Sequence, residues 1–348
     1  MNIQKILSRV IFKGIFVIIL LAIYLAITFY FFKKKKILVN NDVEYDLIIP
    51  SRLLDIQLFI KHKQFYQKFL GHKNIILICP PNKNKLNLNE PSISFINEDS
   101  LVPKERVIEF LWKMRSIKSN RIGWYEQQFL KMAYSRICQK EYYLVWDLDT
   151  IPIKPIKMFQ GTIPFFDMKT EHHIPYFITI ERLIPGLNFT NQSYISEHMM
   201  IKTELMKNLI YNIEMNNKIP GKLFWEKILM CIDIKNIHKS GFSEYEIYGS
   251  FVDNKFPNLY NHRRWYSRRD ISFFFNSSEN LNEKDIKWLS QDYHALSFER
   301  WKVFRFIKKN LKIIKNSKIQ KLYKPNNFFK IYENISKRYR KICKYNKI

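Results

Sequence analysis

Several residue types are scarce in this chain of 348 residues, and each scarcity removes a class of protein from consideration. The chain has 4 cysteines, which are far apart and form no CxxC pair; they are Cys79, Cys138, Cys231 and Cys343. Such spacing argues against a disulfide framework and against a zinc site. Acidic residues are also few, 31 against 58 lysines and arginines, so the formal net charge is +27.

This positive charge raises nucleic acid and anionic membranes as partners. No RNA-binding aromatic motif or zinc-finger spacing accompanies the charge, which makes nucleic acid an unlikely partner. Residues 301–348 carry 16 lysines or arginines and a single acid, Glu333, with apolar residues between them. We interpret 301–348 as a basic C-terminal tail that lies on an anionic membrane surface as an amphipathic helix.

Residues 14–32 form a 19-residue stretch without a charge. A helix of that length spans the hydrocarbon core of a membrane. The stretch is too long for the apolar part of a signal peptide, and no small-residue cleavage site follows it. We therefore predict that residues 1–36 are a single-pass N-terminal anchor with basic flanks. Lysines lie on both sides, and the four at 33–36 favour a cytoplasmic position for that side, which leaves a Golgi-like orientation as the alternative.

The segment 37–300 shows alternating strand and helix patterns. The expected strands are 45–50, 74–79 and 142–146, and the expected helices between and after them are 53–70, 102–118, 124–137, 203–214 and 223–233. This alternation is typical of an α/β domain with a mostly parallel central sheet and flanking helices. We also consider that 243–248 is extended.

Two carboxylates end the third of these strands. Tyr142 to Trp146 are apolar, as in a buried strand, and Asp147 and Asp149 follow directly. Ligands of open α/β sheets bind outside the carboxyl ends of the strands. Hard divalent cations prefer carboxylate oxygens. The pair therefore predicts a cation site that holds a nucleoside diphosphate.

A pattern of this kind, two aspartates one residue apart followed by a threonine, is also the first motif of haloacid-dehalogenase-type phosphatases. In that class Asp147 would be the nucleophile and Asp149 the general acid. The motif of that class usually lies on the first strand of its domain, and a second acidic pair downstream completes its magnesium site. Neither condition holds here, so a phosphatase is disfavoured.

Four motifs occur in a characteristic order: GWYEQQFLKM (123–132), WDLDTIPIKP (146–155), SEHMMI (196–201) and SEYEIYGSF (243–251). From about residue 44 to 301 the chain resembles the GT-A glycosyltransferases, and more closely a group of them that shares these motifs. The resemblance implies a Rossmann-like GT-A fold, a nucleoside-diphosphate sugar donor and a divalent cation, Mn²⁺ or Mg²⁺. It also implies transfer of the sugar to a hydroxyl of a glycan, glycoprotein or glycolipid acceptor.

The resemblance suggests roles for donor and metal residues. Asp149 is the first candidate for the metal, and Asp147 for the donor ribose or the water shell of the metal. His294, near the end of the domain, is a candidate third metal ligand, with a structural histidine as the alternative. The candidate donor-binding residues are Gln127, Gln128 and Lys131, of which Gln127 and Lys131 share a helix face. Four arginines of the polar loop 261–270 are candidates for binding a phosphate, with solvated loop charges as the slightly favoured alternative; they are Arg263, Arg264, Arg268 and Arg269.

Two pairs are candidates for the catalytic base that an inverting transfer requires. Glu244 and Glu246 would point to one side if 243–248 were extended. Glu197 and His198 are the competing pair. Whether the anomeric configuration is retained or inverted stays open. The alternative to an enzyme is a non-catalytic membrane-bound protein of the same fold that binds polyanions, with an affinity that falls steeply with salt.

Overall fold

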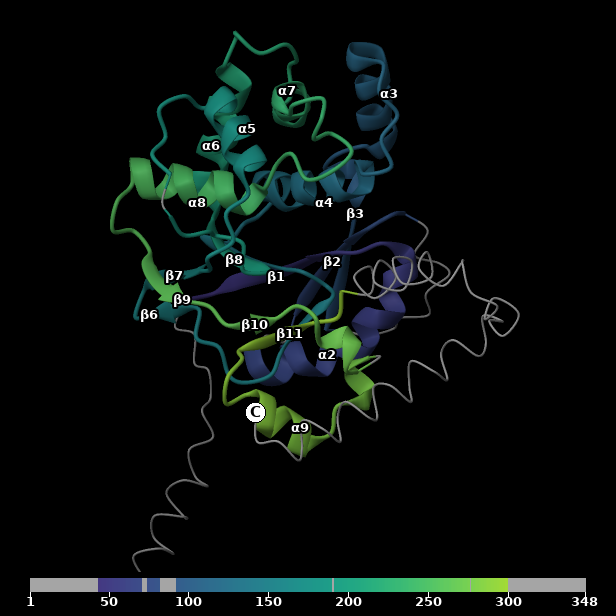
Figure 1. The fold of residues 1–348 in the computed structure, drawn as a ribbon, viewed down its shortest axis with the longest axis vertical. Coiled ribbons are helices and arrows are strands. Elements are labelled where there is room, and N and C mark those ends of the chain that lie inside the picture. The colour runs from purple at the N-terminus through teal and green to yellow at the C-terminus, as the bar shows by residue number, and fades with distance from the viewer. Residues whose placement is uncertain (1–42, 71–73, 82–91, 190, 276, 300–348) are drawn as a thin grey trace, which may run out of the picture. The chain divides into compact units, whose positions relative to one another are not determined.

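The computed structural model describes residues 43–70, 74–81, 92–189, 191–275 and 277–299 (Figure 1). The predicted anchor at 14–32 and the basic tail at 301–348 lie outside these residues. Within the described part of the chain, no helix is both long enough and apolar enough to cross a membrane.

A five-stranded sheet forms the centre of the described chain, in the order β3-β2-β1-β4-β8. Its strands are β1 (Tyr45–Pro50), β2 (Ile75–Cys79), β3 (Ile93–Asn97), β4 (Tyr142–Trp146) and β8 (His198–Lys202). The first four run parallel, and β8 pairs with β4 in the antiparallel direction. The predicted α/β class with a mostly parallel central sheet is confirmed.

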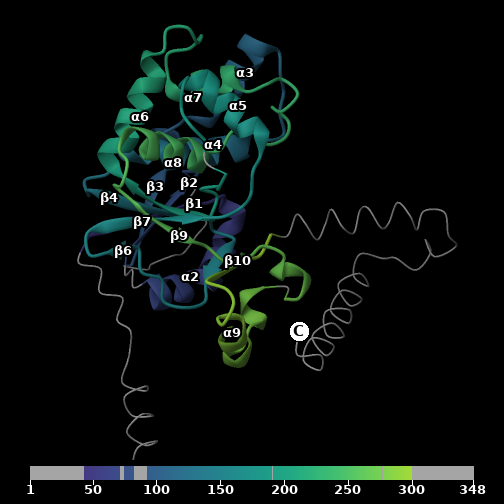
Figure 2. The same cartoon turned by 60° about the vertical axis from the view of Figure 1, so that its left-hand side comes forward.

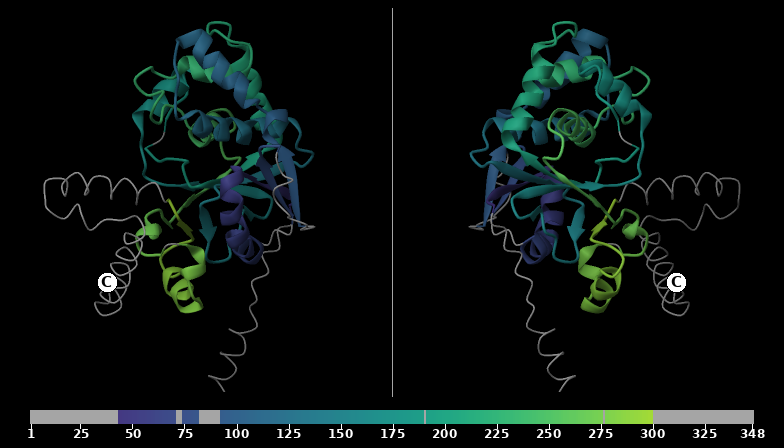
Figure 3. Two further views of the ribbon diagram at one scale, coloured as in Figure 1. Left: turned by 90° about the vertical axis from the view of Figure 1, so that its right-hand side faces the viewer. Right: turned by 90° about the vertical axis from the view of Figure 1, so that its left-hand side faces the viewer.

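Helices cover both faces of this sheet. Helix α2 (Ile56–Leu70) lies on one face, as all the views show (Figures 1 and 2). The other face carries α3 (Lys104–Arg115), α4 (Ile122–Ala133), α5 (Ile174–Leu183), α6 (Thr203–Met215), α7 (Phe224–Cys231) and α8 (Glu244–Lys255) (Figure 3). Because both faces are covered, the central strands are apolar throughout rather than alternating.

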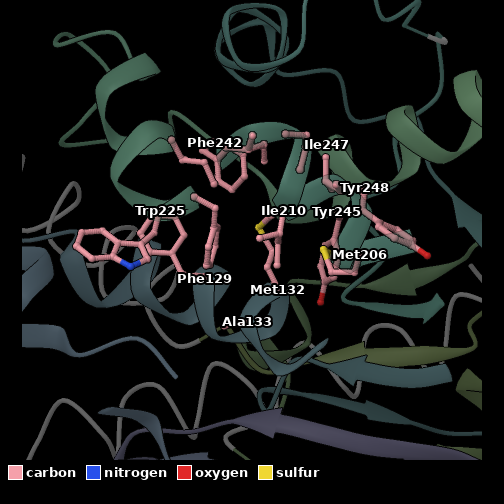
Figure 4. Packing of buried hydrophobic residues seen from close by; sticks show 14 of the residues in the cluster. Phe129, Met132, Ala133, Met206, Ile210, Trp225, Phe242, Tyr245, Ile247 and Tyr248 are labelled. Carbon is pink, nitrogen blue, oxygen red and sulfur yellow. The ribbon is translucent and has the colours of Figure 1, made fainter. Parts of the chain in front are cut away.

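Successive residues of the central strands serve two different cores, as the period of two in a strand requires. Ile48 and Val145 pack with the helices α4 to α8. Leu47 and Leu144 pack with α2. Figure 4 shows the first of these cores, where side chains of α4 such as Phe129 point toward residues of α6, α7 and α8. The two layers hold β4 rigidly on both sides.

Two small sheets extend the fold beyond the end of β4. One has the order β10-β11-β5, with β5 (Thr150–Pro152), β10 (Ser267–Arg268) and β11 (Ala295–Ser297). The other has the order β6-β7-β9, with β6 (Phe159–Gln160), β7 (Ile163–Met168) and β9 (Asn261–Arg264). Helix α9 (Glu283–Leu289) precedes β11. These sheets bring residues far apart in the sequence to the turn after β4.

The structure differs from the sequence prediction at two places. Strand β3 was not predicted, so the strand that ends in the two aspartates is the fourth in chain order rather than the third. The segment 243–248 is not extended but begins α8, and the Ser243 hydroxyl accepts a hydrogen bond from the Glu246 amide at 3.4 Å. Serine is a favoured residue at this capping position, and the cap outweighs the β-forming tyrosines and isoleucine.

Gly249 of α8 allows a tyrosine ring to approach the helix backbone. A Cβ atom at this position would lie 2.2 Å from Cγ of Tyr194. Real Cβ contacts are never this short, and the Tyr194 ring is buried in the core. The glycine in SEYEIYGSF therefore serves packing between α8 and the segment before β8.

We expect Gly249→Ala to lower the free energy of unfolding by about 1–3 kcal/mol, because overpacking forces the Tyr194 ring out of place. Gly123→Ala in α4 is the matched control, since no atom lies within 4 Å of its new Cβ. That control is expected to be neutral or to stabilise by about 0.4–1 kcal/mol. Thermal and urea denaturation measure both, and equal effects of the two substitutions would contradict the packing role.

Candidate active site

The two aspartates lie at a topological switch point of the central sheet. From β1 the chain proceeds to β2 and β3 on one side and then crosses to β4 on the other side of β1. Asp147 and Asp149 follow the last residue of β4 at the carboxyl edge. In open α/β sheets, ligands bind at this position. The predicted place of the pair, directly after a buried strand of the central sheet, is confirmed.

A buried lysine holds Asp147. Nζ of Lys131 lies 2.6 Å from Oδ1 of Asp147, 2.7 Å from Oε1 of Glu244 and 3.0 Å from the Tyr245 hydroxyl. Burial alone would lower the pKa of Lys131, but the charges of Asp147 and Glu244 raise it well above its ordinary value. Lys131 is only 3% exposed, so it joins α4, β4 and α8 and does not face a ligand.

The neighbouring glutamines of α4 have different environments. Oε1 of Gln128 accepts a hydrogen bond from the Glu244 amide at 3.1 Å, which satisfies a free N–H group at the start of α8. Gln128 is buried, and Gln127 is half-buried. Of the three residues predicted to bind the donor from α4, Gln127 alone has exposed surface.

Asp149 carries a carboxylate that the described residues leave without an ion pair. Its Oδ1 accepts a hydrogen bond from the Thr150 hydroxyl at 3.2 Å. Burial raises the pKa of Asp149 to about 7, and repulsion from Asp147 and Glu299 adds to the effect. The side chain keeps part of its surface exposed. A carboxylate that lacks an ion pair and is repelled by neighbouring carboxylates is stabilised by a bound cation.

A second ionic network lies beside Asp149. Glu197 contacts Lys169, receives hydrogen bonds from Ser267 at 2.8 Å and Trp265 at 3.1 Å, and lies 3.3 Å from Nε of Arg269. Arg269 also pairs with Glu299 at 2.6 Å and Glu171 at 2.7 Å. Glu197 has a left-handed φ of 64°, which these contacts maintain against its steric cost.

The four predicted catalytic residues are all buried; Glu197, His198, Glu244 and Glu246 are 3%, 1%, 4% and 1% exposed. Nδ1 of His198 lies 2.9 Å from the Ser196 carbonyl, and Nε2 lies 2.9 Å from Oδ2 of Asp167. Both ring nitrogens of His198 therefore already have protein partners, which argues against its contact with a substrate.

Glu244 and Glu246 do not share one side. As residues of the first turn of α8 they lie about 200° apart around the helix axis. Glu244 faces Lys131, whereas Glu246 contacts the Ser193 hydroxyl. Burial raises the pKa of Glu246 to about 7. The expected pairing of the two carboxylates is wrong because the segment is helical.

His294 does not lie beside the aspartate pair, because the strand register places it opposite Ile153. The Phe298 amide donates to the Asp149 carbonyl at 2.7 Å, whereas the Ile153 amide donates to the His294 carbonyl at 2.9 Å. Four residues along a strand correspond to about 13 Å. The side chain stacks on Trp265 at 4.8 Å, and burial lowers the pKa of His294 to about 4. These positions support the structural alternative for His294.

A divalent cation fits the donor set at this turn. Across the described residues, no group of three or more His, Cys, Asp or Glu side chains forms a metal site. Mg²⁺ and similar ions are, however, often bound by one or two carboxylates together with substrate phosphates. Asp149, with Asp147 beside it, offers hard oxygen ligands of this kind.

Sequence reasoning missed Tyr245, Lys169 and Glu299. The Tyr245 hydroxyl lies 3.2 Å from Oδ1 of Asp147. Glu299 lies five residues after His294 in the sequence. The antiparallel register of β11 with β5 places Glu299 beside the turn that carries Asp149. A two-stranded pairing between 150–152 and 295–297, if recognised in the sequence, would have indicated Glu299.

The fold is that of an α/β protein with two carboxylates, Asp147 and Asp149, at the switch point of its sheet. The chain belongs to a family of unknown function (DUF6492), whose model matches residues 53–333. A search of curated proteins gives no significant match.

Three solved glycosyltransferases illustrate the structural similarity. Mouse xyloside xylosyltransferase 1 in its apo form is 11% identical, with 73% of this chain and 97% of that chain covered and a TM-score of 0.39. The galactosyltransferase LgtC in complex with donor and acceptor sugar analogues is 9% identical, with 73% and 87% covered and a TM-score of 0.37. GlyE of Streptococcus pneumoniae TIGR4 is 10% identical, with 74% and 55% covered and a TM-score of 0.32. Because these TM-scores are below 0.5, the structural similarity does not identify a function for this chain.

Removing the buried cation should leave the buried carboxylate of Glu244 and the half-buried carboxylate of Asp147 without their ion pair. We expect Lys131→Met to lower the free energy of unfolding by about 3–5 kcal/mol. The double variant Lys131→Met/Glu244→Gln should recover part of this loss, because one of the two charges is then neutral. Urea denaturation of both variants measures the recovery. Equal stability of the single and double variants would show that Lys131 and Glu244 are not coupled.

The raised pKa of Asp149 gives a stability effect with a definite sign. The folded pKa of about 7 lies above the ordinary 3.8, so the folded state retains a proton that the unfolded state loses between these values. Without metal, stability should therefore fall as pH rises from about 4 to 7. Asp149→Asn should be more stable than the native chain by about 1–2 kcal/mol near pH 8, after allowance for its partial exposure.

Thermal denaturation near pH 4 and pH 8 measures this difference. Near pH 4 the two proteins should be equally stable, since Asp149 is then neutral in the folded state. If Asp149→Asn were more stable than the native chain by the same amount at both pH values, the raised pKa of Asp149 would be contradicted.

Proposed function

We propose that this protein is a metal-dependent glycosyltransferase. It transfers a sugar from a nucleoside-diphosphate sugar to an acceptor hydroxyl of a glycan or glycoconjugate. One observation carries the proposal: at the switch point of the sheet, Lys131 holds Asp147, whereas Asp149 has no ion pair within the described chain. The motif resemblance of 123–132, 146–155, 196–201 and 243–251 to GT-A glycosyltransferases supports the same conclusion.

The balance of charge at the site supports a requirement for a cation. Among the described residues, the two networks around the turn hold six carboxylates and three cationic side chains, an excess of three formal negative charges. They are Asp147, Asp149, Glu171, Glu197, Glu244 and Glu299, against Lys131, Lys169 and Arg269. A diphosphate would be repelled by this site alone, whereas a divalent cation bridges carboxylate and phosphate oxygens. The acidic site is local, because the whole chain has a net charge of +27.

The residues of the chain divide into those that contact ligands and those that hold them. Asp149 and Asp147 would bind Mn²⁺ or Mg²⁺, which when bound neutralises charge on the departing diphosphate. Gln127, half-buried on α4, would contact the donor. Lys131, Gln128 and Glu244 fix the start of α8 against α4. We assign Glu197, His198 and Glu246 to the support of the site, because they are buried and engaged.

The alternative is a non-catalytic protein that binds polyanions, which the net charge favours. The formal negative charge around Asp149 argues against a polyanion site at this turn. Membrane attachment through residues 14–32, with the basic tail at 301–348 on the membrane surface, remains part of the proposal. Under it, the acceptor is a glycan or glycoconjugate that a membrane-anchored enzyme can reach.

We expect Asp149→Ala to reduce metal-dependent transfer and donor hydrolysis by more than about a hundredfold, because the cation loses its main ligand. The assay combines a panel of uridine, guanosine and cytidine diphosphate sugars with Mn²⁺, and thermal shifts identify the donor that binds. Glu204→Ala on α6 is the control, because Glu204 is 74% exposed and pairs only locally with Lys207. Full activity of folded Asp149→Ala would contradict the assignment of Asp149 as a metal ligand.

A further inference from the structure

Main-chain hydrogen bonds join the turn 147–150 to the segments that precede β8 and follow β11. The Asp147 amide donates to the Glu197 carbonyl at 2.9 Å, and the Phe298 amide donates to the Asp149 carbonyl at 2.7 Å. Within the turn, the Thr150 amide donates to the Asp147 carbonyl at 3.0 Å. These contacts fix the ends of the turn but leave the Leu148 carbonyl to other partners.

Helix α2 supplies those partners. Nδ1 of His62 lies 2.9 Å from the Leu148 carbonyl, and the Tyr66 hydroxyl lies 3.0 Å from the same oxygen and 3.1 Å from the Thr150 carbonyl. Carbonyls only accept, so Nδ1 of His62 carries a proton and donates it. Both side chains are 0% exposed. The indole N–H of Trp146 also donates to the Thr150 carbonyl, at 2.7 Å.

These contacts fix the main chain from which the two carboxylates project. Leu148 lies between Asp147 and Asp149, its side chain is buried with the residues of α2, and its carbonyl is bonded to His62 and Tyr66. Asp147 and Asp149, on either side of it, keep exposed surface.

We propose that His62 and Tyr66 are positioning residues of the metal site. They act through the Leu148 and Thr150 carbonyls, hold the two carboxylates at a fixed separation, and contact neither metal nor substrate. The inference rests on the proposed function, because it assigns a cation to Asp149. Neither residue was predicted from the sequence, since nothing in helix 53–70 indicates that two of its buried side chains face a turn 80 residues further on.

Tyr66→Phe tests the proposal with a closely matched control. The substitution removes one oxygen and leaves the ring in its contacts with Phe59 and Trp146. Tyr248→Phe is the control: Tyr248 is also 0% exposed, and its hydroxyl also has two partners, the Lys202 amide at 2.8 Å and the Tyr260 hydroxyl at 2.9 Å. Lys202 pairs with Tyr142, at the opposite end of β4 from the aspartates.

The measurement is a titration of the full chain in detergent with Mn²⁺ alone, followed by the loss of the free-ion signal in electron paramagnetic resonance. Tyr66→Phe should weaken Mn²⁺ binding by roughly 10–100-fold, as is typical when a partner of a metal ligand is removed. Tyr248→Phe should change it less than about twofold, even if the two variants lose equal thermal stability. His62→Phe should weaken binding in the same direction, and an excess of Mn²⁺ should restore the site in each α2 variant.

Unchanged Mn²⁺ affinity in folded Tyr66→Phe, or equal losses in Tyr66→Phe and Tyr248→Phe, would overturn the proposal. So would a native chain that binds no Mn²⁺. The outcome is separate from that of the proposed function. If Mn²⁺ binds and Tyr66→Phe weakens it while no nucleotide sugar is turned over, the positioning role stands and the glycosyltransferase proposal fails.

Discussion

The site depends on one largely buried ion triad, in which the amine of Lys131 lies between the half-buried carboxylate of Asp147 and the buried carboxylate of Glu244. The three residues come from α4, from the end of β4 and from the start of α8. Removal of three charges from water is costly, and only close mutual contacts offset that cost. The triad therefore requires the three elements to meet in one arrangement.

The α/β class and the edge of the sheet that carries Asp147 and Asp149 were predictable from sequence. Both depend on local signals, namely an apolar run of strand length and the acids that end it. Strand β3 was missed because it lies at the edge of the sheet, contains polar residues and follows a long polar segment, whereas β2 and β4 are apolar runs of the same length. The start of α8 was misjudged because the tyrosines and isoleucine of 243–248 favour a strand, whereas Ser243 favours a helix cap.

The roles of single residues were less predictable, because they depend on contacts between distant segments. Lys131 shares a helix face with Gln127, as expected, but burial directs it to Glu244 rather than to a ligand. His294 was placed by its order in the sequence, whereas the strand register makes Glu299 the nearer neighbour of Asp149. Periodicity determines which face a residue occupies, but not which element covers that face.

The separation of charge within the chain has a consequence for how ligands arrive. An excess of positive charge attracts anions to a protein surface over distances set by the ionic strength, and so raises the rate of encounter. The carboxylates at the turn after β4 then oppose the last step of entry for an anion that comes without its counter-ion. Under the proposed function, a chain with this distribution of charge would select a nucleotide already complexed with a metal over the free nucleotide, and that selection would be kinetic as well as thermodynamic.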